Sequence, residues 1–174
     1  MELSGTKIIH AERSAVWEAL NNPTVLKEAV PGCSEMNGSA EEGFDAVVTQ
    51  KVGPVKATFK GNVTLSNIVP EQSYTISGKG SGGVAGFASG GADVVLTDHA
   101  EGTELSYTVN AKVGGKLAQL GSRLINGFAA KMADQFFVRF KDAVESDGAE
   151  GGEATADQGE APAPKPGFLK RVLG

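Results

Sequence analysis

Residues 78–83, Gly-Lys-Gly-Ser-Gly-Gly, match the GxGxxG pattern of dinucleotide-binding proteins. In those proteins a strand leads into the glycines and a helix follows, so that backbone N–H groups at the helix start meet a pyrophosphate. Here a strand pattern precedes the glycines, but a second strand pattern, residues 87–99, follows them. The motif therefore indicates a flexible connection between two strands, and we do not predict a nucleotide site.

Side chains suited to metal binding or nucleophilic catalysis are few. His10 and His99 are the only histidines and Cys33 is the only cysteine. They fall on separate predicted elements, without the spacing of metal ligands, so we predict no metal site. Cys33 follows a Pro-Gly turn without a neighbouring base to activate it. Asp93 alternates with the apolar residues of its strand and is predicted to face solvent, which leaves no candidate catalytic residue.

Overall composition excludes some classes of protein. The formal net charge of −5 argues against a nucleic-acid-binding protein, which needs a basic face to neutralise phosphates. A single cysteine is compatible with a reducing compartment. The N-terminal residues lack the apolar run of a signal peptide, and no stretch approaches the ~18 apolar residues of a spanning helix. We therefore expect a cytoplasmic protein.

Hydrophobic periodicity predicts an α+β domain over residues 1–146. A period of two residues predicts seven strands, and residues 55–67 are the clearest case, with apolar or small side chains at the odd positions from 55 to 65. A period of 3.6 residues predicts two short helices after the first strand and a long C-terminal helix. The predicted strands are 2–10, 33–37, 44–52, 55–67, 72–79, 87–99 and 103–113, and the predicted helices are 11–21, 24–30 and 116–144.

Small residues recur on the predicted apolar faces of the strands, for example Ala57, Gly61, Gly90 and Ala92. Either the sheet curves tightly at its glycines, or a cavity stays open between the sheet and the long helix. The sequence leaves both alternatives open. If a cavity exists, strand and helix phase predict that it is lined by Val48, Phe59, Val63, Tyr74, Ile76, Phe87, Val94, Leu96, Tyr107, Val109, Leu117, Leu120, Leu124 and Phe128.

The C-terminal residues change in composition. Between residues 142 and 160 there are seven acids and no base, so we expect residues 147–166 to form a disordered acidic linker rich in Ala, Pro and Gly. Residues 167–174 are predicted to form a short amphipathic membrane-binding peptide, because apolar and basic residues reappear together there. Its predicted membrane contacts are Phe168, Leu169, Lys170, Arg171, Val172 and Leu173. As a helix it would be only about 12 Å long, so it is too short to span a bilayer.

Several stretches of the sequence resemble the CoxG family of carbon monoxide dehydrogenase subunits, within the START-like (SRPBCC) helix-grip superfamily. The resemblance covers about residues 1–145. It rests on residues 16–20 (VWEAL), 30–33 (VPGC), 51–54 (KVGP) running into 57–61 (AxFxG), the glycine-rich region 80–91, and residues 113–125 (VGGKLAQLGSRLI). The implied fold is a curved seven-stranded antiparallel sheet wrapped around the long C-terminal helix.

The resemblance also implies a function, which the residues alone do not. Members of this family are associated with molybdenum hydroxylases of the carbon monoxide dehydrogenase type as non-catalytic accessory proteins. They are held to link the enzyme to the inner face of the cytoplasmic membrane and, in some members, to bind a respiratory quinone in the cavity. The implied ligand is menaquinone or ubiquinone, and the implied location is peripheral to that membrane.

Two other functions stay open. Other helix-grip proteins are cyclases or hydrolases of small aromatic substrates, and an enzyme of that kind needs ionisable groups in its cavity. Tyr74 and Tyr107 are the only obvious polar side chains at the predicted inward positions, which disfavours acid–base chemistry. The last alternative is an interaction module with a filled core and no ligand.

Overall fold

The computed structural model describes residues 1–153, with side chains for residues 1–146. Residues 154–166 of the predicted linker and the predicted peptide 167–174 lie outside the described residues. The elements are β1 (Glu2–Ile9), α1 (Arg13–Leu20), α2 (Pro23–Ala29), β2 (Cys33–Ser39), β3 (Gly43–Val52), β4 (Val55–Val69), β5 (Ser73–Ser81), η1 (Gly83–Ala85), β6 (Phe87–His99), β7 (Gly102–Gly114), α3 (Lys116–Gln119) and α4 (Ser122–Glu153).

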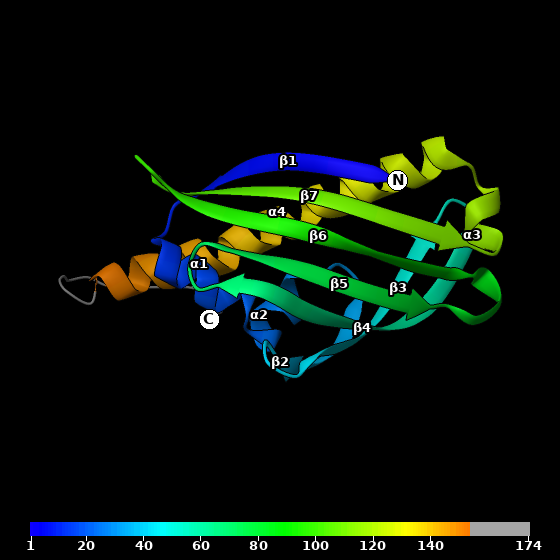
Figure 1. Cartoon of the computed structure of the whole chain (residues 1–174), viewed down its shortest axis with the longest axis horizontal. Coiled ribbons are helices and arrows are strands. Elements are labelled where there is room, and N and C mark those ends of the chain that lie inside the picture. The colour runs from blue at the N-terminus through cyan, green and yellow to red at the C-terminus, as the bar shows by residue number, and fades with distance from the viewer. Residues whose placement is uncertain (154–174) are drawn as a thin grey trace.

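The strands form a single sheet in the order β1-β7-β6-β5-β4-β3-β2. Every neighbouring pair is antiparallel. Figure 1 shows α4 running the length of one face of the curved sheet, with α1 and α2 beside its C-terminal half. The predicted α+β helix-grip fold is confirmed, including its seven strands and the two short helices after β1.

The break between α1 and α2 follows from Asn22 and Pro23. Proline disfavours the helical conformation for the residue before it, so α1 ends at Leu20, and Pro23 is then well placed in the first turn of α2. The Asn22 side-chain oxygen accepts hydrogen bonds from the backbone N–H groups of Thr24 and Val25, at 2.9 and 3.4 Å. This cap fixes the direction in which α2 leaves α1.

The long C-terminal helix differs from the prediction in one respect. It was predicted to be continuous over residues 116–144, but it is broken between α3 and α4. Gly121 has a φ of +91°, a left-handed conformation that glycine adopts without strain. α4 begins at Ser122 and runs past residue 146, the predicted end of the domain, to Glu153. The apolar stripe predicted along one helix is therefore divided between two.

The interior consists of two apolar clusters. The larger joins α1, the strands and the C-terminal half of α4 around fully buried residues such as Ile9, Val16 and Phe140. The smaller lies at the α3 end, around Val52, Leu117 and Ile125. Among the described residues, no helix combines the length and apolar character needed to cross a membrane.

Candidate functional site

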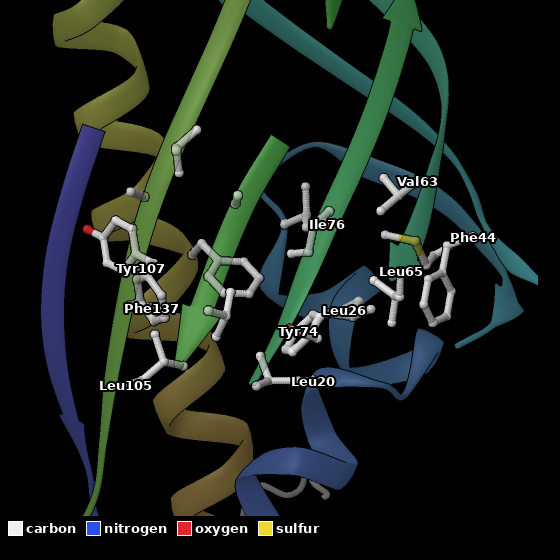
Figure 2. A pocket seen from close by; sticks show the side chains of 17 residues that line it. Leu20, Leu26, Phe44, Val63, Leu65, Tyr74, Ile76, Leu105, Tyr107 and Phe137 are labelled. Atoms are coloured by element: carbon white, nitrogen blue, oxygen red, sulfur yellow. The ribbon is translucent and has the colours of Figure 1, made fainter. Parts of the chain in front are cut away.

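An apolar cavity of about 300 Å³ lies between the inner face of the sheet, the face that α4 covers, and the helices. It falls within the range of about 300–1,000 Å³ that is typical of small-molecule sites. The strands β2 to β7 form its floor, and α1, α2 and α4 form the other walls (Figure 2). The lining residues are Leu20, Leu26, Val30, Met36, Phe44, Val63, Leu65, Tyr74, Ile76, Ala92, Val94, Leu105, Tyr107, Val109, Ala133, Phe136 and Phe137.

Two small residues help to explain why space remains in this part of the interior. Ala92 lies in the centre of the sheet, paired with Ile76 of β5 and Val109 of β7. Ala133 lies on α4 and also lines the cavity. Each side chain is a single methyl group, so neither fills the gap that the curved sheet leaves beneath the helix. Of the two alternatives left open by the sequence, the structure contains the cavity.

Stacked aromatic rings form one wall of the cavity. The ring of Tyr107 stacks on that of Phe137, with a centroid distance of 5.2 Å and an interplanar angle of 24°. Phe136 meets Phe137 edge-on at 5.0 Å. The Tyr107 hydroxyl turns away toward β1 (Figure 2), where a Cβ at Gly5 would lie only 2.6 Å from it. Glycine at position 5 thus makes room for the hydroxyl and leaves the Tyr107 ring as an apolar surface of the cavity.

Tyr74 is the most deeply buried phenol in this wall. Its side chain is 4% exposed, and its ring meets that of Trp17 edge-on at 5.3 Å. Burial raises the pKa of Tyr74 well above its usual value, because the phenolate is poorly solvated in an apolar surrounding. The hydroxyl therefore keeps its proton at any physiological pH. It is a hydrogen-bond donor and not a general base.

This pKa shift predicts a stability change in alkali. An unfolded tyrosine titrates near pH ~10, whereas folded Tyr74 keeps its proton to higher pH. Its contribution to stability is complete below about pH 10 and is lost as the pH rises toward the folded-state pKa. Above about pH 10 the unfolding free energy should fall by up to about 1.4 kcal/mol per pH unit on account of this group. Urea denaturation across that range should show a shallower fall for Tyr74→Phe, and equal slopes would contradict the prediction.

Part of the predicted cavity lining surrounds this cavity. Val63, Tyr74, Ile76, Val94, Tyr107 and Val109 all lie along its wall. Sequence reasoning missed the contribution of α1, α2 and β2, because it assigned the cavity to the other strands and the long helix alone. It also omitted Leu65 and Leu105. Leu65 has the same strand phase as Val63, and Leu105 the same as Tyr107, and both of those residues were predicted. Phe136 and Phe137 lie within the predicted C-terminal helix 116–144 but were not assigned to the cavity.

The other predicted residues lie elsewhere. Leu117, Leu120 and Phe128 join the smaller cluster at the α3 end, as does Phe59. The first turns of α4 also pack in this smaller cluster, through Ile125 and Phe128, so the residues of α4 that reach the cavity begin only at Ala133. Leu96 is packed in the larger cluster, and Val48, half-buried on β3, is not part of the cavity wall.

Two of those predictions fail because the side chains are exposed. Phe87 is 52% exposed, since the inward residues of β6 are Ala92, Val94 and Leu96 and position 87 has the opposite phase. Leu124 is 41% exposed and lies against the turn at Gly53. Neither side chain is part of the cavity wall.

The residues considered for chemistry lie away from the cavity. His10 contacts Glu101 and Glu145 at the surface, and the Asp93 carboxylate accepts a hydrogen bond from Thr75 at 2.9 Å. The GxGxxG segment, residues 78–83, covers the end of β5 and the first residue of η1, and the strand β6 follows this single 3₁₀ turn, as predicted. Within residues 1–146 there is no group of three or more His, Cys, Asp or Glu side chains arranged to hold a metal ion. The cavity itself has no charged lining residue, so it is suited to binding an apolar molecule.

Solved structures share this architecture. A conserved protein from Geobacillus kaustophilus is 26% identical, with a TM-score of 0.78 over 84% of this chain and 96% of that chain. An uncharacterised protein from Rhizobium leguminosarum is 13% identical, with a TM-score of 0.66 over 84% and 95%. A protein from Thermus thermophilus is 12% identical, with a TM-score of 0.65 over 84% and 99%. The latter two likenesses concern the fold alone.

The sequence itself shows the family. None of the curated proteins compared with this chain matches it. Residues 5–145 match the family described as the CoxG subunit of carbon monoxide dehydrogenase, and this span includes all the strands except the first residues of β1. The chain therefore belongs to the CoxG family of carbon monoxide dehydrogenase, a family of accessory subunits.

Proposed function

We propose that this protein binds a respiratory quinone, menaquinone or ubiquinone, in its apolar cavity. In this role it is the non-catalytic accessory of a molybdenum hydroxylase of the carbon monoxide dehydrogenase type. The observation that supports this most directly is the cavity lining, which consists of aliphatic and aromatic side chains, including two tyrosines, and one methionine. Membership of the CoxG family supports the partner enzyme.

The cavity offers what a quinone ring needs. The ring is flat and apolar on both faces, and the stacked pair Tyr107 and Phe137 provides a matching aromatic surface. Its carbonyl oxygens accept hydrogen bonds, and Tyr74 is a phenol that keeps its proton. An apolar cavity of roughly 150 Å³ holds a benzene molecule, so about 300 Å³ suffices for a substituted ring and the first part of an isoprenoid chain.

A bound quinone would accept electrons that the partner enzyme releases and carry them toward the respiratory chain. This role requires no catalytic side chain in the accessory protein. It requires a site that shelters an apolar molecule from water and a means of staying near the membrane that holds the quinone pool. The predicted peptide 167–174, which lies outside the described residues, is the proposed attachment to the inner leaflet of the cytoplasmic membrane.

The experiment that tests the ligand is mass spectrometry of an organic extract from the protein purified from a quinone-producing host. We expect close to one quinone per chain, because a largely apolar cavity of this size favours retention of an apolar ligand through purification. A protein that yields no quinone, and that takes none up when incubated with quinone-loaded vesicles, would refute the proposed ligand. Recovery of a different lipid would keep the cavity as a binding site but exclude the electron-transfer role.

A further inference from the structure

The end of the domain opposite α1 has exposed bases and few acids. Residues 46–70, 72–92 and 105–133 contain no aspartate or glutamate, although the whole chain has a net charge of −5. Figure 1 shows the β3–β4 turn, the β5–β6 connection and α3 together at this end. The bases of these segments are all exposed, and they are Lys51, Lys56, Lys60, Lys79, Lys112, Lys116, Arg123 and Lys131.

Five of these lysines lie on the outer face of the sheet, the face turned away from α4. We call Lys51, Lys56, Lys60, Lys79 and Lys112 the basic face. They alternate with the inward residues of their strands, and all five are exposed. The ion pairs found among the described residues involve only Lys7, His10 and Arg13 as bases, so none of them neutralises the basic face.

Strand register brings these like charges together. Lys51 is directly opposite Lys56. Ser89 of β6 is opposite both Lys79 of β5 and Lys112 of β7, so these two lysines lie in one row across three strands. Like charges placed opposite one another in a sheet reduce its stability. An anionic partner for this face would relieve that repulsion.

Acidic residues of the outer face flank the basic face, and Asp93, exposed on the outer side of β6, lies beyond it toward the α1 end of the strand. Asp45 is opposite Asn62, which is in turn opposite Lys79. Glu2 is opposite Asn110, two residues before Lys112. The positive surface between Asp45 and Glu2 spans the strands β3 to β7, which at about 4.8 Å per strand is roughly 19 Å across. It is wide enough to meet several anionic groups at once.

Apolar side chains project from the same end. Phe87 is 52% exposed and lies on the outer face, where it is opposite Ser81. A shallow groove beside its ring is lined by Lys60, Lys79 and Ser89 among others. Val84, in η1 immediately before β6, is 86% exposed. Single exposed apolar residues are common, but Phe87 lies beside two lysines of the basic face, and Val84 projects from the same end of the domain.

This combination favours a lipid surface over a protein or a nucleic acid. Interfaces between proteins are depleted in lysine and enriched in arginine, tyrosine and tryptophan, whereas every base of this face is lysine. Single-stranded nucleic acids stack on successive aromatic rings, and Phe87 is the only aromatic side chain on this face within residues 1–146. Lysines that surround projecting apolar side chains are typical of proteins that rest on anionic membranes.

We propose that the basic face docks on an anionic lipid surface, with Val84 and Phe87 entering the headgroup region. This contact belongs to the folded domain and is distinct from the proposed contact of peptide 167–174. It rests on the membrane association proposed above, but not on the peptide or on the identity of the ligand in the cavity. The domain would then lie with the outer face of its sheet against the bilayer.

The test is flotation of the full-length protein with vesicles of phosphatidylcholine, with and without about 30% phosphatidylglycerol. Lys79→Gln/Lys112→Gln removes two charges from the basic face. If each lysine accounts for about fivefold in the partition coefficient, the pair should lower binding to the anionic vesicles about 25-fold. The matched control, Lys27→Gln/Lys131→Gln, removes two exposed charges from α2 and α4 and should change binding little. Val84→Ser/Phe87→Ser should also weaken binding.

A variant lacking residues 167–174 separates this face from the peptide. If the face docks, that variant still prefers anionic vesicles, and Lys79→Gln/Lys112→Gln weakens its binding further. If the deletion abolishes binding and the lysine substitutions have no effect, the peptide is the only anchor and the face proposal fails. It also fails if the parent protein does not bind to the anionic vesicles. Lastly, it fails if the lysine variant binds vesicles normally but loses affinity for the purified molybdenum hydroxylase, since the partner is then an acidic protein.

Discussion

Ala133→Phe is expected to empty the cavity of its ligand while leaving the domain folded. Ala133 lies on α4 and lines the cavity, so a phenylalanine there directs its ring into the space of about 300 Å³. If the new ring displaces about 100 Å² of buried ligand surface, the loss is about 2.5 kcal/mol, or about 60-fold in affinity. Quinone recovered from the purified protein should fall to the background level.

The melting temperature distinguishes loss of the ligand from unfolding of the domain. A ring that fills existing space adds apolar contacts, so the melting temperature of ligand-free Ala133→Phe should equal or exceed that of the ligand-free parent. Val138→Phe is the matched control, because residue 138 lies on the same helix but is 62% exposed. The control should retain the ligand. If Ala133→Phe retains it too, at normal stability, the ligand does not occupy this cavity.

The sequence predicted the fold well because alternation and periodicity are local properties. Residues 55–67 alternate between apolar and polar side chains through most of their length, and β4 extends from Val55 to Val69. The break at Asn22 and Pro23 is equally local, and the structure has it there. The break at Gly121 was missed because the apolar stripe continues across it, and one glycine is insufficient to predict a left-handed conformation.

The cavity was harder to predict because it depends on distances between elements. Strand phase identifies inward residues such as Val63 and Val109, but phase does not tell which inward residues touch a helix and which face open space. That depends on the curvature of the sheet and on the position of α2. Leu26 and Val30 reach the cavity only because α2 packs beside α4, a contact between segments about a hundred residues apart.

Phe87 illustrates a different limit. It was assigned to the cavity on strand phase, but its phase is opposite to that of the inward residues Val94 and Leu96. The structure places it among lysines on the outer face. Charge and exposure together, rather than hydrophobicity alone, indicate what such a residue does. Phe87, predicted from the sequence to line the ligand cavity, is therefore proposed to contact the membrane instead.

Phe140→Ala and Phe136→Ala should differ sharply in their effect on stability, although the two residues are one turn apart on α4. Phe140 is fully buried in the larger cluster, and its ring stacks on Phe136 at 5.6 Å. Removing it leaves a cavity among closely packed neighbours, at a cost of about 3–5 kcal/mol. Phe136 is half-buried and already faces the open cavity, so its loss removes fewer contacts and should cost about 1–2 kcal/mol.

Urea denaturation of the ligand-free proteins measures this difference, and Phe140→Leu provides a milder variant if Phe140→Ala does not fold. At about 2–4 °C per kcal/mol for a protein of this size, Phe140→Ala should melt roughly 10 °C lower than the parent. Phe136→Ala should melt only a few degrees lower, and it should bind bulkier apolar ligands because its cavity is larger. Equal destabilisation by the two alanine substitutions would mean that Phe136 is packed as closely as Phe140. The space beside it would then be filled by side chains, and the cavity that supports the proposed function would not exist in solution.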